Sequence, residues 1–128
     1  MQDSFTSRQA GTADGCIWFF EDVETPPWHL DGFLEQLYRA GKLDGVAGVV
    51  VGDMEKSDWR EDRPEWSRTK SLEDVLELRL LRLGVPVLYK LPLGHGKHLA
   101  TLPLGVGSTL NADAGTLTID EPALRPVP

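Results

Sequence analysis

The sequence predicts an α/β fold: a mixed sheet with a parallel core, two main helices and a C-terminal β-hairpin. Short, unbroken apolar runs are typical of parallel strands, which are covered on both faces. Two segments between or after these runs place apolar residues at helical spacing. Near the C-terminus, Ala114 and Gly115 separate two short segments in the manner of a hairpin turn. Strand, helix and strand in succession indicate a βαβ unit, which gives the sheet its parallel core.

The first half of the chain supplies that unit. The first predicted strand is Cys16–Phe20, a run of apolar, β-branched and aromatic residues that leads directly into two carboxylates. A helix is predicted over residues 28–41, where Gly41 suits a left-handed cap. The second apolar strand, Val46–Val51, ends just before Gly52 and Asp53. Five apolar residues fall on one face of the predicted helix: Leu30, Phe33, Leu34, Leu37 and Tyr38.

A long charged segment separates this unit from the second helix. Residues 54–70 show no clean period, so we expect a surface loop in which Trp59 and Trp66 either anchor the loop or line a neighbouring site.

The second half begins with a helix that Ser71 is expected to open, since Asp74 stands three residues later as in a capping box. Apolar residues follow at roughly helical spacing up to Gly84, which ends the helix. A third strand is predicted over residues 85–94, and residues 107–119 are predicted to form the closing hairpin.

The folded domain is expected to occupy residues 16–122, an ordinary size for one hydrophobic core. Residues 1–15 are polar and contain two glycines, so we expect a flexible lead or the remnant of a linker. Residues 123–128 are expected to form an irregular tail.

Charge and cysteine content narrow the class of protein. The formal net charge is −7 and the isoelectric point about 4.8, values that disfavour a nucleic acid or an anionic membrane as partner. The single cysteine, Cys16, has no partner for an intrachain disulfide, and no signal peptide or long apolar run is present. We therefore expect a cytoplasmic protein. Cys16 is interpreted as a buried, unreactive thiol, because no cationic residue stands beside it in the sequence.

Polar side chains stand where the predicted strands end, which is where α/β folds place their chemistry. Glu21 and Asp22 follow the first strand, Asp53 the second and His95 the third. A carboxylate and an imidazole brought together there would form an orienting pair, in which the carboxylate fixes the tautomer of the ring. Glycines on both sides of His95 would let the backbone approach a partner closely. The plainer interpretations are carboxylates at the point where a strand meets solvent, a turn histidine and, for Asp53, a helix or turn cap.

No complete catalytic centre follows from these residues. None of the serines stands in a nucleophile elbow between a strand and a helix. The spacing of the three histidines and the single cysteine makes no metal cluster, so no metal site is expected. His29 and His98 are interpreted as surface or packing residues. The sequence thus offers a base and an orienting carboxylate but no nucleophile.

Two long segments carry a resemblance to a known family. They are "IWFFEDVETPPWHLDGFLEQLYRAGKLDGVAGVVVGD" and, after a helix, "GVPVLYKLPLGHGKHLATLPLG". Together they resemble the carboxyl-terminal domain of the LD-carboxypeptidases, the serine peptidase family of muramoyl-tetrapeptide carboxypeptidases and microcin C immunity proteins. The resemblance covers residues from Gly15 to about Pro122, and it implies a swivelling β/β/α domain.

The resemblance implies a Ser-Glu-His triad that is divided between two domains. Glu21 matches the family's catalytic glutamate and His95 its catalytic histidine, while the serine belongs to an amino-terminal nucleophile domain that this chain lacks. The family hydrolyses an amide between an L-centre and a D-residue, and typically releases terminal D-alanine from cytoplasmic murein tetrapeptides during cell-wall recycling. It needs no cofactor or metal. The implied partners are a murein peptide, the nucleophile domain of the same protein and, as in relatives, a second copy in a homodimer.

Several alternatives stay open at this point. We expect an excised domain of a longer enzyme, inactive alone, rather than a natural short protein. The alternative outside the enzymes is a self-standing module of the same fold, which binds wall-derived peptides or a partner protein without hydrolysis. A microcin-type immunity peptidase is the alternative among enzymes. Gly32 and His98 stand where relatives commonly carry arginine and asparagine, so the resemblance leaves substrate preference open.

Overall fold

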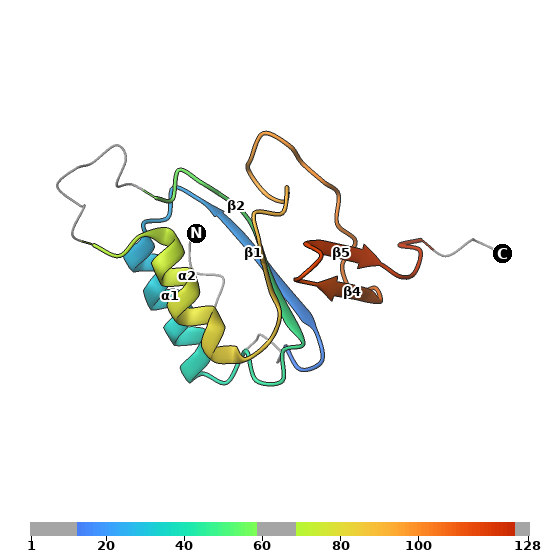
Figure 1. Ribbon diagram of the computed structural model, residues 1–128, viewed down its shortest axis with the longest axis horizontal. Helices are drawn as coiled ribbons and strands as arrows, with labels where there is room; N and C mark the ends of the chain where they lie inside the picture. The colour runs from blue at the N-terminus through green and yellow to red at the C-terminus, as the bar shows by residue number, and fades with distance from the viewer. Residues whose placement is uncertain (1–12, 59–68, 125–128) are drawn as a thin grey trace.

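The computed structural model describes residues 13–58 and 69–124. Within these residues, three parallel strands alternate with two α-helices, and a pair of antiparallel strands follows (Figure 1). The predicted α/β class, parallel core, helices and terminal hairpin are confirmed. The elements are β1 (Ile17–Val23), α1 (Pro27–Arg39), β2 (Gly48–Glu55), α2 (Leu72–Leu80), the 3₁₀ turn η2 (Leu81–Leu83), β3 (Val87–Tyr89), β4 (Ser108–Asn111) and β5 (Thr116–Ile119).

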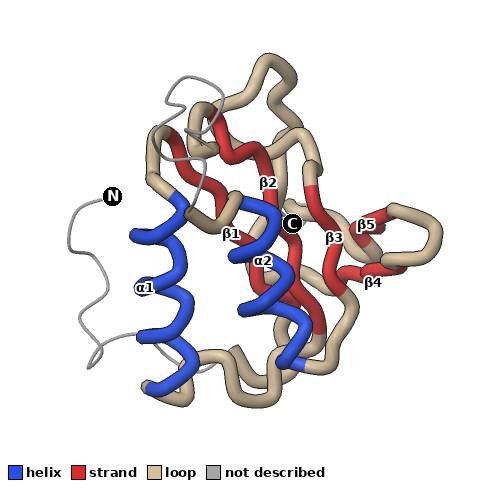
Figure 2. The backbone as a smooth tube through the Cα atoms, turned by 60° about the vertical axis from the view of Figure 1, so that its left-hand side comes forward, coloured by secondary structure: helices blue, strands red, loops and turns tan. Residues whose placement is uncertain are grey.

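β2 lies at the centre of the parallel sheet, between β1 and β3. Its residues Val49, Val50 and Val51 are fully buried, as expected for a strand with a neighbour at each edge and cover on both faces. The strand order follows the chain order, so both crossovers run the same way and α1 and α2 lie on one face of the sheet (Figure 2). The segment after β3 is left to cover the other face.

β4 and β5 pair with each other in a sheet of their own. Residues 112–115 form the turn between them, and Gly115 adopts φ +67°, a conformation that favours glycine. The hairpin approaches the parallel sheet at Gly48, where a Cβ atom would lie only 2.7 Å from Cδ2 of Leu110. Because Gly48 has no side chain, the hairpin packs closely against the start of β2.

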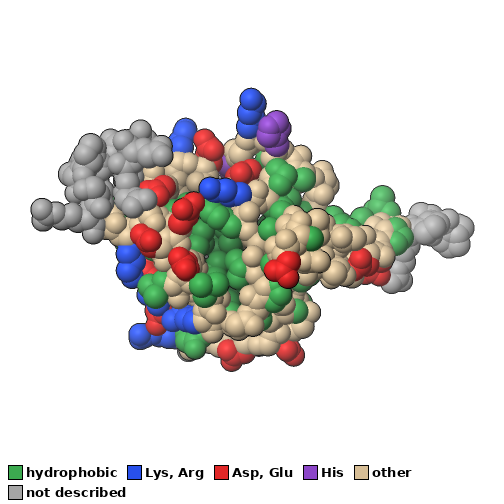
Figure 3. Space-filling view, viewed as in Figure 1, with side chains coloured by type: hydrophobic (Ala, Val, Ile, Leu, Met, Phe, Trp, Pro, Cys, Tyr) green, Lys and Arg blue, Asp and Glu red, His purple; other side chains and the backbone are tan. Residues whose placement is uncertain are grey.

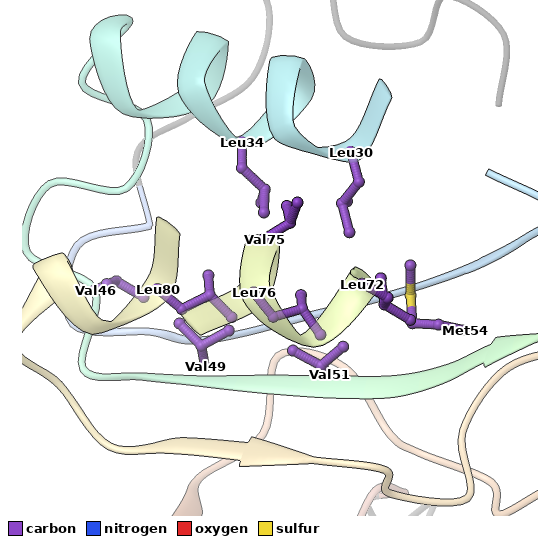
Figure 4. Close-up of a cluster of buried hydrophobic side chains, with 10 residues drawn as sticks. All are labelled: Leu30, Leu34, Val46, Val49, Val51, Met54, Leu72, Val75, Leu76 and Leu80. Carbon is purple, nitrogen blue, oxygen red and sulfur yellow. The ribbon is translucent and has the colours of Figure 1, made fainter. Parts of the chain in front are cut away.

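The main hydrophobic core fills the space between the helices and the parallel sheet (Figure 4). Side chains of α1 point toward those of α2, which in turn lie over β2. Burying one such valine or leucine completely stabilises a fold by about 1.5–3 kcal/mol, so this layer holds both helices on the sheet. The buried members are Leu30, Leu34, Val46, Val49, Val51, Met54, Leu72, Val75, Leu76 and Leu80.

The predicted apolar face of α1 is only partly buried. Leu30 and Leu34 are 2% exposed, whereas Phe33 is 37% and Tyr38 43% exposed. A narrow stripe is enough here, because α1 buries these two leucines in the core, where it packs against α2. Tyr38 instead lies under the guanidinium group of Arg82, which is 3.6 Å from the ring centroid in a cation–π contact.

Three expectations about the strands are corrected by the structure. β1 is an edge strand and its residues 17–20 are half-buried, not covered on both faces. Cys16, just before β1, is exposed, so the prediction of a buried thiol is wrong. β3 ends at Tyr89 and does not reach residue 94, because Lys90 turns into the left-handed region with φ +66° and Pro92 has no N–H for a ladder.

Some sequence-based expectations lie outside the described residues. The surface loop predicted from residue 54 begins later, because β2 continues to Glu55 and Met54 is buried in the core. Residues 59–68 of that loop, with Trp59 and Trp66, lie outside the described residues. Residues 1–12 and 125–128 are also outside. The described chain begins at Ala13, whose N–H donates to the carbonyl oxygen of Lys42 at 3.1 Å. The part of the chain that the structure describes contains no helix with the length and apolar character needed to cross a membrane.

α2 begins with the predicted capping box. The Asp74 N–H donates to Oγ of Ser71 at 2.9 Å, and the Ser71 N–H donates to Oδ2 of Asp74 at 2.8 Å. These two bonds satisfy backbone donors that have no partner inside the helix. η2 continues the helix as far as Gly84, whose φ of +68° ends it as predicted.

A cluster of ion pairs joins α1 and α2 away from the core. Arg79 of α2 donates to both Asp31 and Glu35 of α1, and Arg82 pairs with Glu35 at 2.9 Å. Figure 3 shows acidic and basic side chains interspersed over the helical side of the molecule. The hydrogen bond from Arg79 holds the pKa of Asp31 below its ordinary value. The charged cluster therefore adds to the core in fixing the two helices against each other.

The capping box predicts a measurable loss of stability when its serine is removed. Ser71→Ala deletes the acceptor for the Asp74 N–H and is expected to lower the free energy of unfolding by about 1 kcal/mol. Urea denaturation followed by circular dichroism measures the change. Ser71→Thr keeps a hydroxyl group and is expected to lose roughly half as much or less. Equal losses in the two variants would contradict the capping role.

The ion-pair cluster predicts a pH-dependent contribution from Asp31. Because folding lowers the pKa of this carboxyl, its contribution is complete above the unfolded pKa and is lost as the pH falls through the folded pKa. We expect the urea midpoint of the native chain to exceed that of Asp31→Asn at pH 7, and the difference to shrink below about pH 4. Asp113→Asn, on the exposed hairpin turn, is the matched control. A pH-independent difference for Asp31→Asn would speak against this role.

Candidate active site

The structure brings Glu21 and His95 together, although 74 positions separate them in the chain. Nδ1 of His95 lies 2.6 Å from Oε2 of Glu21, within hydrogen-bond distance. The His95 side chain is 56% exposed and that of Glu21 is 26% exposed. The carboxylate is thus the more enclosed partner, and the ring stands at the surface.

A register shift between β1 and β2 sets the position of Glu21. The two strands pair regularly up to Phe20 and Val51, and again from Asp22 and Met54. Between these pairs β1 has one residue, Glu21, and β2 has two. Such a bulge interrupts the ladder and re-aims a side chain, and bulges are frequent beside active sites.

Two glycines allow the loop after β3 to approach this bulge. Gly52 lies in β2, where a Cβ would be 2.5 Å from the carbonyl oxygen of Leu93. Gly94 has φ +108°, and a Cβ there would be 2.6 Å from Cγ of Glu21. Leu93 is 4% exposed and anchors the loop in the interior. His95 therefore comes directly after two residues, Leu93 and Gly94, that lie in close contact with the strands.

Gly52 and Leu93 shape the site, and sequence reasoning did not identify either as a site residue. The available signal was a glycine at the end of a strand pattern, which often marks a bulge or the close approach of another backbone. Which backbone approaches is a property of the folded chain.

The other two carboxylates take different positions. Asp22 is 7% exposed, and its carboxylate accepts hydrogen bonds from the Val23 N–H at 2.8 Å and the Thr25 hydroxyl at 2.6 Å. It stabilises the turn that leaves β1. Asp53 lies inside β2, which continues to Glu55, so the interpretation of Asp53 as a helix or turn cap is wrong.

The other two histidines are His29 and His98. Both are exposed, as predicted. His29 belongs to α1, where its ring lies 6.1 Å from that of Trp28 and 6.4 Å from that of Phe33, centroid to centroid. His98 lies further along the loop that carries His95.

The pair can hold and transfer a proton, but it needs a nucleophile to activate. In residues 13–58 and 69–124, no serine hydroxyl bonds to His95: Ser57 donates to a carbonyl of its own turn, Ser71 caps α2, and Ser108 donates to the Val106 carbonyl. Across the same ranges, no three His, Cys, Asp or Glu side chains are grouped to hold a metal ion. The described residues thus contain a hydrogen-bonded imidazole and carboxylate without a nucleophile beside them.

Comparison with known proteins shows the family of this chain. The family model described as LD-carboxypeptidase C-terminal domain matches residues 2–110. The protein named "Putative carboxypeptidase" in Streptomyces coelicolor is 41% identical over 112 residues, which are 88% of this chain and 33% of that protein. A protein of Synechocystis that is also named "Putative carboxypeptidase" is 37% identical over 105 residues, which are 82% of this chain and 34% of that protein.

A third relative has a more specific name, the "Probable murein peptide carboxypeptidase" of Bacillus subtilis. It is 31% identical over 107 residues, 83% of this chain and 32% of that protein. The chain thus spans about a third of the length of these relatives. Both the family match and the similarity to these relatives extend over most of the chain. The chain belongs to the LD-carboxypeptidase family and corresponds to its C-terminal domain.

Proposed function

We propose that this chain supplies the glutamate and the histidine of a Ser-Glu-His triad whose serine lies on another domain of the same protein. The observation that carries the proposal is the 2.6 Å contact between Nδ1 of His95 and the carboxylate of Glu21. In a triad of this kind, the carboxylate holds the imidazole in one tautomer and stabilises the imidazolium that forms. The length of the relatives, about three times the matched region, supports a separate nucleophile domain.

Each ring nitrogen then has its own task. With Nδ1 donating to Glu21, Nε2 of His95 carries the lone pair and acts as the base. It takes the proton of the serine hydroxyl as that oxygen attacks the scissile carbonyl, and then gives the proton to the leaving amine. A water molecule releases the acyl group by the same proton transfers in turn. The exposure of the His95 ring suits a base that must reach a serine outside the described residues.

The proposed substrate is the L,D-amide of a murein tetrapeptide, and the proposed product is terminal D-alanine. Such a reaction would serve cell-wall recycling in the cytoplasm. The name of the Bacillus relative, a murein peptide carboxypeptidase, supports this class of substrate. The proposed partners of the chain are accordingly the peptide and the nucleophile domain.

The triad assignment predicts the kinetics of two variants of the full-length protein. Glu21→Ala and His95→Ala are each expected to lower kcat by about 10⁴-fold in the release of D-alanine from an L,D-linked tetrapeptide. The double variant is expected to lose little more, because triad residues act as a unit.

His98→Ala is the matched control for these variants, since His98 is exposed on the same loop. It is expected to retain turnover, and circular dichroism verifies that all variants fold. Loss of turnover in His98→Ala with retention in His95→Ala would show the assignment to be wrong.

The close approach of the loop predicts a strong effect of one added methyl group. In Gly94→Ala the new Cβ would collide with the Glu21 carboxyl group, and the contact between Glu21 and His95 is expected to break. A displacement of about 1 Å at the base lowers kcat by about 10²-fold. Gly105→Ala is the matched control, because Gly105 has φ +74° but open space around it, so alanine there adds backbone strain alone. Equal losses of kcat in Gly94→Ala and Gly105→Ala would rule out the specific collision at Gly94.

A further inference from the structure

Asp53 has no task in the proposed triad, yet it lies at the bulge beside the loop that carries His95. It is one of the two β2 residues that stand opposite Glu21. Its N–H donates to the carbonyl oxygen of Leu93 at 2.7 Å. The backbone of Asp53 therefore holds the loop two residues before His95.

The side chain of Asp53 meets the same loop on the other side of His95. A Cβ built on Gly96 would collide with the carboxyl group of Asp53, 2.9 Å from Oδ1 and closer still to the other carboxyl oxygen. The hydrogen that Gly96 carries in place of a side chain thus faces that carboxyl group. Gly96 is not among the residues with positive φ, so it is close approach and not backbone freedom that requires a glycine here.

The two glycines around His95 are enclosed by two carboxylates. Gly94 lies against the carboxyl group of Glu21, and Gly96 lies against that of Asp53. Both carboxylates come from the same irregular point of the sheet, where one residue of β1 faces two of β2. The backbone on each side of His95 therefore lies against a carboxyl group of the sheet, although glycines are the residues with the greatest freedom of their own.

We propose that Asp53 is a positioning residue, which holds the backbone on both sides of His95 so that the ring meets Glu21. Its N–H fixes the loop before the histidine and its carboxyl group fits against the loop after it. A base is useful only when its supporting residues hold it in the productive geometry. The effect on turnover rests on the proposed function, whereas the positioning itself is a property of the chain without substrate.

The tautomer of the His95 ring reports its contact with Glu21, and it can be measured without substrate. In the full 128-residue chain at alkaline pH, ¹⁵N NMR is expected to show His95 protonated at Nδ1. Asp53→Ala and Gly96→Ala are each expected to weaken this signal, the first by removing the carboxyl group that the loop meets after His95 and the second by displacing that group. Both variants keep the Asp53 N–H and its bond to Leu93. Asp53→Asn keeps the shape of the side chain and is expected to retain the signal.

The double variant Asp53→Ala/Gly96→Ala tests the contact itself. In the absence of the Asp53 carboxyl group, the methyl group at position 96 has nothing to displace, so it is expected to add no further change. Gly107→Ala is the matched glycine control, because its Cβ would lie 3.5 Å from Glu121, an ordinary contact. Asp113→Ala, on the exposed hairpin turn, is the carboxylate control. Both controls are expected to keep the native signal.

Two results would overturn the proposal. One is a native His95 signal in Asp53→Ala, even where urea denaturation shows a loss of stability, since that pattern belongs to a merely structural residue. The other is a Gly96→Ala substitution that weakens the Nδ1 signal of His95 equally with and without the Asp53 carboxyl group.

Kinetics of the full-length enzyme separate this proposal from the proposed function. Asp53→Ala is expected to lower kcat by about 10²-fold and to change KM by less than about twofold, because a displaced base weakens the chemical step and not substrate binding. If the NMR signal is lost while kcat is unchanged, Asp53 positions the ring and the triad role of His95 fails. If the signal survives, the positioning role fails whatever the kinetics show.

Discussion

One backbone contact, between the bulge of β2 and the loop after β3, supports the whole site. In a regular parallel ladder each backbone N–H of a central strand bonds to a neighbouring strand, and a bulge interrupts that pattern. The N–H of Asp53 is satisfied instead by the carbonyl oxygen of Leu93, and Gly52 leaves room for that oxygen. The hydrogen bond that satisfies this donor also fixes the loop at the bulge that aims Glu21. One irregularity thus brings both members of the pair to the same place.

The layers of the fold make that irregularity tolerable. β2 is held by a strand at each edge, by two helices on one face and by the hairpin and loop on the other. Three consecutive valines of β2 are fully buried just before the bulge, so the strand that carries it has little freedom. The helices are in turn joined by the core and by the Arg79 ion pairs. A rigid scaffold of this kind can position a functional loop, which by itself would be mobile.

The exposure of the two site residues is consistent with a site that another domain completes. The Glu21 carboxylate is enclosed by the loop, while more than half of the His95 side chain is open to solvent. An imidazole in that position meets a partner from outside without disturbing its bond to the carboxylate. Exclusion of water by such a partner would strengthen the electrostatic contact between them. A fold alone does not define a chemistry, which has to be argued from the residues of a site and their geometry.

The sequence by itself determined the α/β class, the start of α2 at Ser71, its end at Gly84 and the hairpin, because these depend on local periodicity, capping and turn chemistry. It also made Glu21 and His95 candidates, together with Asp22 and Asp53, because all four follow apolar runs, and the resemblance to the family singled out the first two. Only the tertiary structure decided the exposure of Cys16, the narrow buried stripe of α1 and the place of Asp53 beside the loop. Each of these depends on which distant segments become neighbours, and no local pattern of residues specifies the backbone groups that meet across a bulge.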